Sequence, residues 1–201
     1  MDKFNQKPKP QFKIEYYNKK NPFKLLYVSD ILPYKNHYVL TNSFLSLNKD
    51  DFPIELSIVG REIHRKSSAD LNRLINKSKN KRVNWKKNIG LDNIYQFYHN
   101  ADCFIFASSC ENMPNILIEA MSSGLPILCS DRGPMRELLK DGGIYYNPES
   151  IEETTISLKK IITDVELRKK ISLRAYQNSL NFSWNNCAEN TFNYLNKFIK
   201  N

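Results

Sequence analysis

The sequence lacks the long apolar run that a membrane-spanning helix requires. No stretch of the 201 residues approaches the roughly 20 consecutive apolar residues needed to cross a bilayer. The first eleven residues, Met1 to Gln11, are polar and rich in Pro and Lys, so they also lack the apolar region of a secretory signal. A cytoplasmic location is therefore the expectation.

Cysteine and histidine are too few and too scattered to indicate a metal centre. The four cysteines contain no Cys-x-x-Cys pair, and three of them lie in apolar or strand-like surroundings, where small buried thiols are common. The three histidines show no metal-ligand spacing with one another or with the cysteines. We therefore expect no metal and treat the cysteines as structural residues.

Two phosphate-binding motifs are also missing. There is no Gly-x-Gly-x-x-Gly fingerprint of a dinucleotide-binding turn and no Gly-x-x-x-x-Gly-Lys-Ser/Thr loop. Phosphate binding would then depend on helix N-termini and on single cations such as Lys35.

Basic residues outnumber acidic residues. The chain has 30 Lys and Arg against 21 Asp and Glu, a formal net charge of +9. This excess favours an anionic partner: nucleic acid, an acidic membrane surface or a phosphorylated small molecule. Charge alone does not choose among these. Because no basic helix face or aromatic stacking motif of the known nucleic-acid-binding modules is present, nucleic acid is not expected as the partner.

What the sequence does contain is a regular alternation of strands and helices. Six β-rich runs are predicted as strands: Phe23–Ser29, Ile54–Gly60, Arg82–Trp85, Asp102–Ala107, Pro126–Ser130 and Ile144–Tyr146. Apolar residues at helical spacing predict helices at 34–49, 68–78 and 91–101, from Pro114, from Pro134, and in three segments between 151 and 200.

Several of the predicted strands are apolar throughout, which is typical of a parallel sheet covered on both faces. The predicted fold class is α/β, with a single Rossmann-like, doubly wound, mostly parallel sheet of about six strands and helices on both faces. It occupies residues 23–201. The Pro-punctuated residues 1–22 are interpreted as a leader or the remnant of an interdomain linker.

Sheets of this kind bind ligands beyond the carboxyl ends of their strands. Several polar residues follow predicted strands: Lys35 after the first, Arg61 after the second, Lys86 and Lys87 after the third, and Glu111 after the fourth. Lys86 and Lys87 are better explained as a solvated pair than as a nucleotide contact, and Arg61 fits either interpretation.

The helix predicted to open at Pro114 is a candidate anion site. Proline suits the first position of a helix, where its missing N–H would have no partner. Met113, the preceding residue, is a poor side-chain cap, so we expect the amides of Asn115 and Ile116 to lack an internal acceptor. An exposed helix start with free amides favours an anion such as phosphate.

The residues around this helix resemble a known family. The segment from Ser109 to Ser130, S-C-E-N-M-P-N-I-L-I-E-A-M-S-S-G-L-P-I-L-C-S, resembles the donor-binding segment of family 4 GT-B retaining glycosyltransferases, the group 1 type. The likeness extends to R-E-L-L-K-D-G-G-I-Y-Y-N-P and to F-S-W-N-N-C-A-E-N-T-F-N-Y-L, and thus to nearly the whole chain. It corresponds to the C-terminal, nucleotide-sugar-binding half of such an enzyme.

The resemblance implies roles for individual residues. Glu119 would accept hydrogen bonds from the ribose hydroxyls, Glu111 would contact the donor sugar, and Lys35 would neutralise the diphosphate. The amides near Asn115 and Ile116 would hold that diphosphate. Met113, Pro114 and Lys86 belong to the same predicted nucleotide-binding set, and the nucleobase would lie against the loop after Trp85.

The resemblance also implies an activity. The expected reaction is transfer of a sugar from a nucleoside-diphosphate sugar to an acceptor, with retention, in polysaccharide or glycolipid synthesis. It would need no metal and no cofactor beyond the donor substrate. The family binds its acceptor with an N-terminal half that this sequence does not contain, so such a domain or subunit is an expected partner, and peripheral contact with an anionic inner membrane face is another expectation.

Some positions depart from the family pattern. Asp30 stands where the family commonly has Arg, and an acid there would repel the diphosphate. Asn36 stands where a Gly usually follows the lysine. The alternative interpretation is therefore a nucleotide-sugar-binding or scaffold subunit that keeps the fold without turnover.

Overall fold

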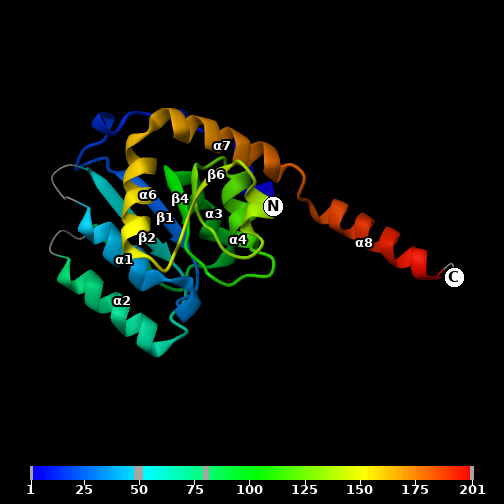
Figure 1. Ribbon diagram of the computed structural model, residues 1–201, viewed down its shortest axis with the longest axis horizontal. Coiled ribbons are helices and arrows are strands. Elements are labelled where there is room, and N and C mark those ends of the chain that lie inside the picture. The colour runs from blue at the N-terminus through cyan, green and yellow to red at the C-terminus, as the bar shows by residue number, and fades with distance from the viewer. Residues whose placement is uncertain (1, 48–51, 79–81, 200–201) are drawn as a thin grey trace.

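The computed structural model describes residues 2–47, 52–78 and 82–199 as one sheet layered between helices (Figure 1). The sheet has six parallel strands in the order β3-β2-β1-β4-β5-β6. Their bounds are β1 Phe23–Val28, β2 Ile54–Val59, β3 Val83–Lys86, β4 Cys103–Phe106, β5 Ile127–Ser130 and β6 Gly143–Tyr146. Each predicted strand is confirmed, and so is the doubly wound α/β fold.

The helices follow the predicted order. Their bounds are α1 His37–Ser46, α2 Arg65–Lys77, α3 Leu91–Asn100, α4 Asn115–Ser122, α5 Met135–Leu139, α6 Ile151–Thr163, α7 Val165–Ser179 and α8 Trp184–Ile199, with 3-10 turns η1 Asp2–Phe4, η2 Ile14–Tyr16 and η3 Pro33–Lys35. Helical predictions at 48–49 and 200 lie outside the described residues. No helix in the described part of the chain combines the length and apolarity needed to cross a membrane.

Local chemistry explains two shifts in helix boundaries. The helix predicted over 34–49 is divided into η3 and α1 because Asn36, between them, has a left-handed backbone with φ of 53°. The helix predicted at 68–78 begins at Arg65, because the imidazole of His64 caps it by accepting a hydrogen bond from the Ser67 amide at 3.2 Å.

The core lies on both faces of the sheet. Alternate residues of a strand point to opposite faces, so Leu25 and Tyr27 of β1 pack with α1, α2 and α6, while Leu26 and Val28 pack with α3, α4 and α5. All four side chains are almost fully buried. Helix α7 contributes to both clusters and packs along α4. This burial on both faces is why the strand shows no alternation of apolar and polar residues.

Among the cysteines, Cys103 and Cys129 are buried in strands. Cys110 and Cys187 are exposed, so the structural role expected for the cysteines is wrong for these two.

The segment interpreted as a leader or linker remnant runs across the domain surface. Arg168 of α7 is fully buried and donates to the carbonyl of Phe12, as well as to those of Ile161 and Ile162. The amide of Gln6 donates to the carbonyl of Ser122 at the end of α4. These contacts fasten the segment to the same domain, beside α3 and α4.

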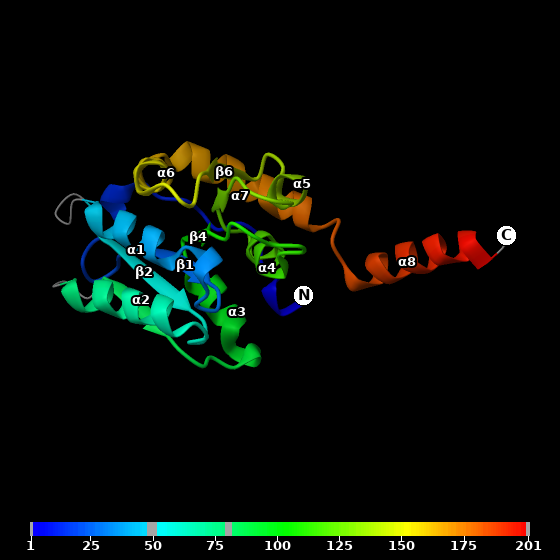
Figure 2. The same cartoon turned by 60° about the horizontal axis from the view of Figure 1, so that its bottom comes forward.

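Helix α8 runs outward from the body of the domain (Figures 1 and 2). Its aromatic residues do not pack against the domain: Trp184 is 71% exposed, and Phe192, Tyr194 and Phe198 are exposed as well. The helical spacing correctly predicted a helix, but the residues that the structure describes offer its apolar face no surface to pack against.

Candidate functional site

The site region lies where the direction of strand order changes. From β1 the chain adds β2 and β3 on one side, then returns to add β4, β5 and β6 on the other. The loops after β1 and β4 therefore separate in opposite directions and leave a crevice at the carboxyl edge of the sheet. Lys35 follows β1 and Glu111 follows β4, so neighbouring strands bring these two predicted residues together.

Hydrogen bonds fix the loop that carries Lys35. The Tyr27 hydroxyl donates to the Lys35 carbonyl at 2.8 Å. The Asn36 side chain donates to the Ala107 carbonyl at 2.8 Å, and the amide of Ser109 donates to the Tyr34 carbonyl at 2.8 Å. Asn36 thus replaces the family's glycine without loss of the turn, because asparagine tolerates left-handed backbone and its amide bridges to the loop after β4.

Lys35 and Glu111 form an ion pair, Nζ donating to Oε1. Only 11% and 17% of their side-chain surfaces are exposed. The two residues predicted to meet the diphosphate and the sugar therefore neutralise each other across the crevice. A buried pair of this kind holds its partners firmly, because removing one leaves the other charged and without compensation.

A cavity of about 610 Å³ opens beside this pair. It is walled by the ends of β1 and β2, the loops that follow them, the start of α3 and one face of α4: Val28, Ser29, Asp30, Leu32, Tyr34, Lys35, Val59, Gly60, Arg61, Asn88, Ile89, Gly90, Leu91, Ile94, Ile116 and Glu119. Of the predicted residues, Lys35, Ile116 and Glu119 line the cavity, and Glu111 adjoins it through Lys35. A cavity of this size suits a small-molecule ligand.

The remaining predicted residues lie outside that wall. Lys86 ends β3 with its side chain exposed, and Met113 is 52% exposed. Asn115 is exposed and Pro114 buried. Their roles in nucleotide binding stay predictions.

The start of α4 differs from the prediction in detail. Helix α4 begins at Asn115, so Pro114 is the residue before the helix and not its first member. The Asn115 amide donates to the Met113 carbonyl at 3.0 Å and is not free. No side chain caps this helix. In the part of the chain that the structure describes, the Ile116 amide has no backbone acceptor, so it is the amide left to meet an anion.

Asp30 does not present an uncompensated charge to the cavity. Arg61, from the loop after β2, donates its backbone amide and Nε to one carboxylate oxygen of Asp30 at 3.0 and 3.1 Å, and its Nη2 to the other at 2.6 Å. These bonds lower the pKa of Asp30 and keep it ionised and paired. The sequence left the role of Arg61 open, and the repulsion expected from Asp30 is offset by this partner.

Gly60 allows the loops after β1 and β2 to meet. A Cβ at this position would lie 1.9 Å from the Ser29 carbonyl oxygen, so only glycine fits. The indole N–H of Trp85 donates to the Gly60 carbonyl at 2.9 Å, and Lys87 Nζ lies 4.0 Å from the centroid of the indole ring. Trp85 therefore supports the cavity wall from behind.

Glu119 is held by a residue to which the sequence gave no functional role. The hydroxyl of Tyr98 in α3 donates to Glu119 Oε2 at 2.8 Å. Burial raises the pKa of Glu119, and the hydrogen bond from Tyr98 opposes that rise. The sequence held one signal for this contact, a tyrosine on the inward face of a predicted helix. A buried tyrosine hydroxyl needs a hydrogen-bond partner.

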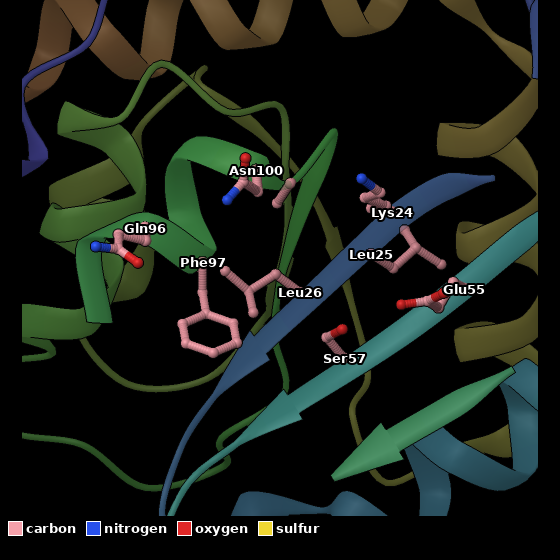
Figure 3. A pocket seen from close by; sticks show the side chains of 9 residues that line it. Lys24, Leu25, Leu26, Glu55, Ser57, Gln96, Phe97 and Asn100 are labelled. Carbon is pink, nitrogen blue, oxygen red and sulfur yellow. The ribbon is translucent and has the colours of Figure 1, made fainter. Parts of the chain in front are cut away.

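A second cavity, of about 250 Å³, lies between α3 and the amino-terminal halves of β1 and β2 (Figure 3). Figure 3 shows the ring of Phe97 and the side chain of Leu26 on one side, with Glu55 and Ser57 of β2 on the other. Because ligands of open α/β sheets bind beyond the carboxyl ends of the strands, the larger cavity is the better candidate site.

Comparison with known proteins agrees with this fold. Residues 9–178 match the family of glycosyl transferases group 1. The O-antigen chain mannosyltransferase B of Escherichia coli is 26% identical over 115 residues, covering 56% of this chain and 30% of that protein.

A second relative comes from Campylobacter jejuni. Its N-acetylgalactosamine-N,N'-diacetylbacillosaminyl-diphospho-undecaprenol 4-alpha-N-acetylgalactosaminyltransferase is 26% identical over 165 residues, covering 80% of this chain and 43% of that protein. The chain thus spans less than half the length of these curated relatives.

A solved structure shares the fold. Anabaena Alr3699/HepE, crystallised in complex with UDP and glucose, superposes with a TM-score of 0.79 at 19% identity, over 93% of this chain and 55% of that one. With the family matched across most of its length and a Rossmann-like domain of GT-B type, this chain belongs to the group 1 glycosyltransferases.

Proposed function

We propose that this domain binds the nucleoside-diphosphate sugar in a retaining glycosyltransferase of family 4. The observation that carries the proposal is the cavity at the carboxyl edge of the sheet. One wall carries Lys35, the wall formed by α4 carries Ile116 and Glu119, and Glu111 pairs with Lys35. These groups support the proposal, because a cation and a free amide would suit the diphosphate and carboxylates would suit the hydroxyls of the ribose and of the sugar on either side of it.

The spacing along α4 fits a nucleotide. A helix rises about 1.5 Å per residue, so Glu119 lies roughly 6 Å along the axis from Asn115. The diphosphate would lie near the Ile116 amide and Lys35, with the ribose toward Glu119. Ionised carboxylates accept but do not donate hydrogen bonds, which suits Glu119 for ribose hydroxyls and Glu111 for sugar hydroxyls.

The proposed chemistry is stabilisation of the leaving group. As the bond between sugar and diphosphate breaks, negative charge grows on the departing nucleoside diphosphate. The Lys35 ammonium and the positive end of α4 would offset that charge without a metal. The acceptor hydroxyl would attack from the face that the leaving group vacates, which retains the anomeric configuration, and its proton would pass to the departing diphosphate. An N-terminal domain or subunit would supply the acceptor wall.

The setting we propose is polysaccharide or glycolipid synthesis with a hexosyl donor. Two relatives are named for O-antigen chain and diphospho-undecaprenol substrates, which supports an acceptor of this class. A net charge of +9 supports peripheral contact with the anionic inner face of a membrane, on the cytoplasmic side. High salt should weaken that contact, because exposed charges are screened within about 10 Å at 0.1 M.

A second candidate is a nucleotide-sugar-binding or scaffold subunit without turnover. It is favoured by the ion pair between Lys35 and Glu111, since each side chain is already paired with the other and does not face a ligand alone. Turnover of a nucleotide sugar by the chain, alone and with a candidate N-terminal partner, separates the two functions.

Calorimetric titration with UDP, GDP and ADP tests the common part of both proposals. We expect one of them to bind, and Lys35→Ala and Glu119→Ala each to weaken binding at least about tenfold, equivalent to 1.4 kcal/mol. Lys159→Ala and Glu152→Ala, exposed on α6, are matched controls that should bind like the natural chain. Duplex DNA should not compete. Binding of none of the three nucleotides, or equal binding by all four variants, would contradict the proposal.

A further inference from the structure

Tyr98 and Glu119 form a hydrogen bond between two helices at the back of the cavity. The Tyr98 hydroxyl of α3 donates to Glu119 Oε2 of α4 at 2.8 Å. Tyr98 is fully buried, whereas Glu119 is only partly buried and lines the cavity. The bond therefore links the protein interior to the candidate ligand space.

Two aromatic neighbours fix the ring of Tyr98. Phe104 of β4 stacks on it, with centroids 5.4 Å apart and planes at 16°. Phe4 meets it edge-on, at 5.3 Å and 89°. A ring held on its face and at its edge has little freedom to turn, so the direction of its hydroxyl is set by packing before any ligand arrives.

We propose that Tyr98 is the positioning residue for Glu119: it holds one carboxylate oxygen so that the other faces the ribose hydroxyls of a bound nucleotide. The inference rests on the proposed function, because it takes Glu119 as the ribose-binding group. Tyr98 itself lies outside the residues that line the cavity and acts through the carboxylate.

The charge state of Glu119 supports this role. Burial raises the pKa of its carboxyl, and the donor hydrogen bond from Tyr98 counteracts that effect. An ionised carboxylate offers only acceptors, as two ribose hydroxyls require, whereas a protonated one would present a competing donor. Tyr98 thus supplies the direction of the carboxylate, and its hydrogen bond favours the ionised form that the proposed contact needs.

The N-terminal segment takes part in the same packing. Phe4 belongs to η1, and its carbonyl accepts a hydrogen bond from the Ser123 hydroxyl just after α4, at 3.0 Å. The ring of Phe4 packs against the ring of Tyr98. A change in this segment would reach Glu119 through Tyr98, which gives residues outside the cavity a measurable effect on it.

The test compares ribonucleotides with their 2′-deoxy forms by calorimetry. UDP and 2′-deoxy-UDP, GDP and 2′-deoxy-GDP, and inorganic pyrophosphate are titrated into the natural chain and into Tyr98→Phe. We expect the natural chain to prefer the ribonucleotide. Tyr98→Phe should weaken ribonucleotide binding about tenfold, bring it close to the deoxy form, and leave pyrophosphate binding unchanged. Tyr95→Phe removes a hydroxyl one turn earlier on α3, beside His99, and should match the natural chain.

Two further variants separate positioning from general stability. Phe4→Leu keeps the Tyr98 hydroxyl but loosens its ring, and should reduce the same preference to a smaller degree. In a Glu119→Ala chain, adding Tyr98→Phe should cause no further loss, because the group to be positioned is gone.

The outcomes distinguish the two levels of the argument. If the natural chain binds no nucleotide, the proposed function fails and this inference fails with it. If the natural chain binds and prefers the ribonucleotide, but Tyr98→Phe keeps that preference, only the inference is overturned. Equal weakening of UDP and pyrophosphate would also overturn it, since that pattern indicates general damage to the domain.

Discussion

The ion pair between Lys35 and Glu111 predicts that Glu111→Gln destabilises the unliganded domain but strengthens the binding of a nucleoside diphosphate. Glu111→Gln keeps the shape of the side chain and its ability to accept a hydrogen bond, but removes the charge. Both partners are largely buried, with 11% and 17% of their side-chain surfaces exposed. Deleting one member of a buried pair costs about 3–5 kcal/mol. Because the amide keeps a weaker bond to Lys35, we expect a loss of about 2 kcal/mol, typical of a hydrogen bond to a charged group.

For a domain of this size, 1 kcal/mol shifts Tm by about 2–4 °C. Without ligand, Glu111→Gln should therefore melt about 4–8 °C below the natural chain. Nucleotide binding should change in the other direction. In the natural chain the diphosphate must compete with Glu111 for Lys35, and in the variant that competitor is neutral. We expect the nucleoside diphosphate to bind about tenfold tighter, a gain of about 1.4 kcal/mol.

Thermal unfolding with and without the best-binding nucleoside diphosphate, together with calorimetric titration, measures both effects. Glu152→Gln, exposed on α6, is the matched control and should change neither. A Glu111→Gln chain that binds the nucleoside diphosphate more weakly would refute the reasoning, because Glu111 would then support the diphosphate and not compete with it. An unchanged Tm would show that the pair does not stabilise the unliganded domain.

Three further predictions follow from single features of the structure. Burial raises the pKa of Glu119, so the folded chain binds the carboxyl proton more tightly than the unfolded chain does, and the free energy of unfolding falls as pH rises from the unfolded pKa of about 4.3 to the higher folded pKa. Glu119→Gln should therefore raise Tm at pH 7 but not below about pH 4. Arg168→Leu would leave two buried carbonyls and the partly buried carbonyl of Phe12 without their donor, at a cost of about 3 kcal/mol and thus about 6–12 °C in Tm, whereas the exposed Arg174→Leu should cost far less. A chain ending at Ser183 should keep the Tm of the full chain, since the aromatic residues of α8 are exposed, and a clear fall would show that α8 packs on the domain in solution.

The fold could be predicted because its signals are local. Apolar runs such as Cys103–Phe106, between segments of helical period, indicate buried parallel strands whatever their order in the sheet. The last helix shows where this reasoning stops. Its pattern predicts an apolar face, but burial depends on a partner surface, and the described residues supply none for Trp184 or Phe198.

The candidate site was predictable in some of its residues but not in its contacts. Sequence spacing and resemblance pointed to Lys35, Glu111 and Glu119, and their roles remain predictions. That Lys35 and Glu111 pair with each other follows from β1 and β4 being neighbours, which depends on strand order. The bond between Tyr98 and Glu119 likewise joins helices whose packing no local pattern specifies.

The position of Trp85 has a practical consequence for optical measurements. The chain has two tryptophans. Trp184 on α8 is 71% exposed, so its fluorescence is that of a solvent-exposed indole. The Trp85 indole donates a hydrogen bond to the carbonyl of Gly60 in the cavity wall and lies beside the Lys87 ammonium. Trp184→Phe would leave one emitter, sensitive to the field and hydration of the cavity. Filling of the site would then be visible as a fluorescence change, without a label.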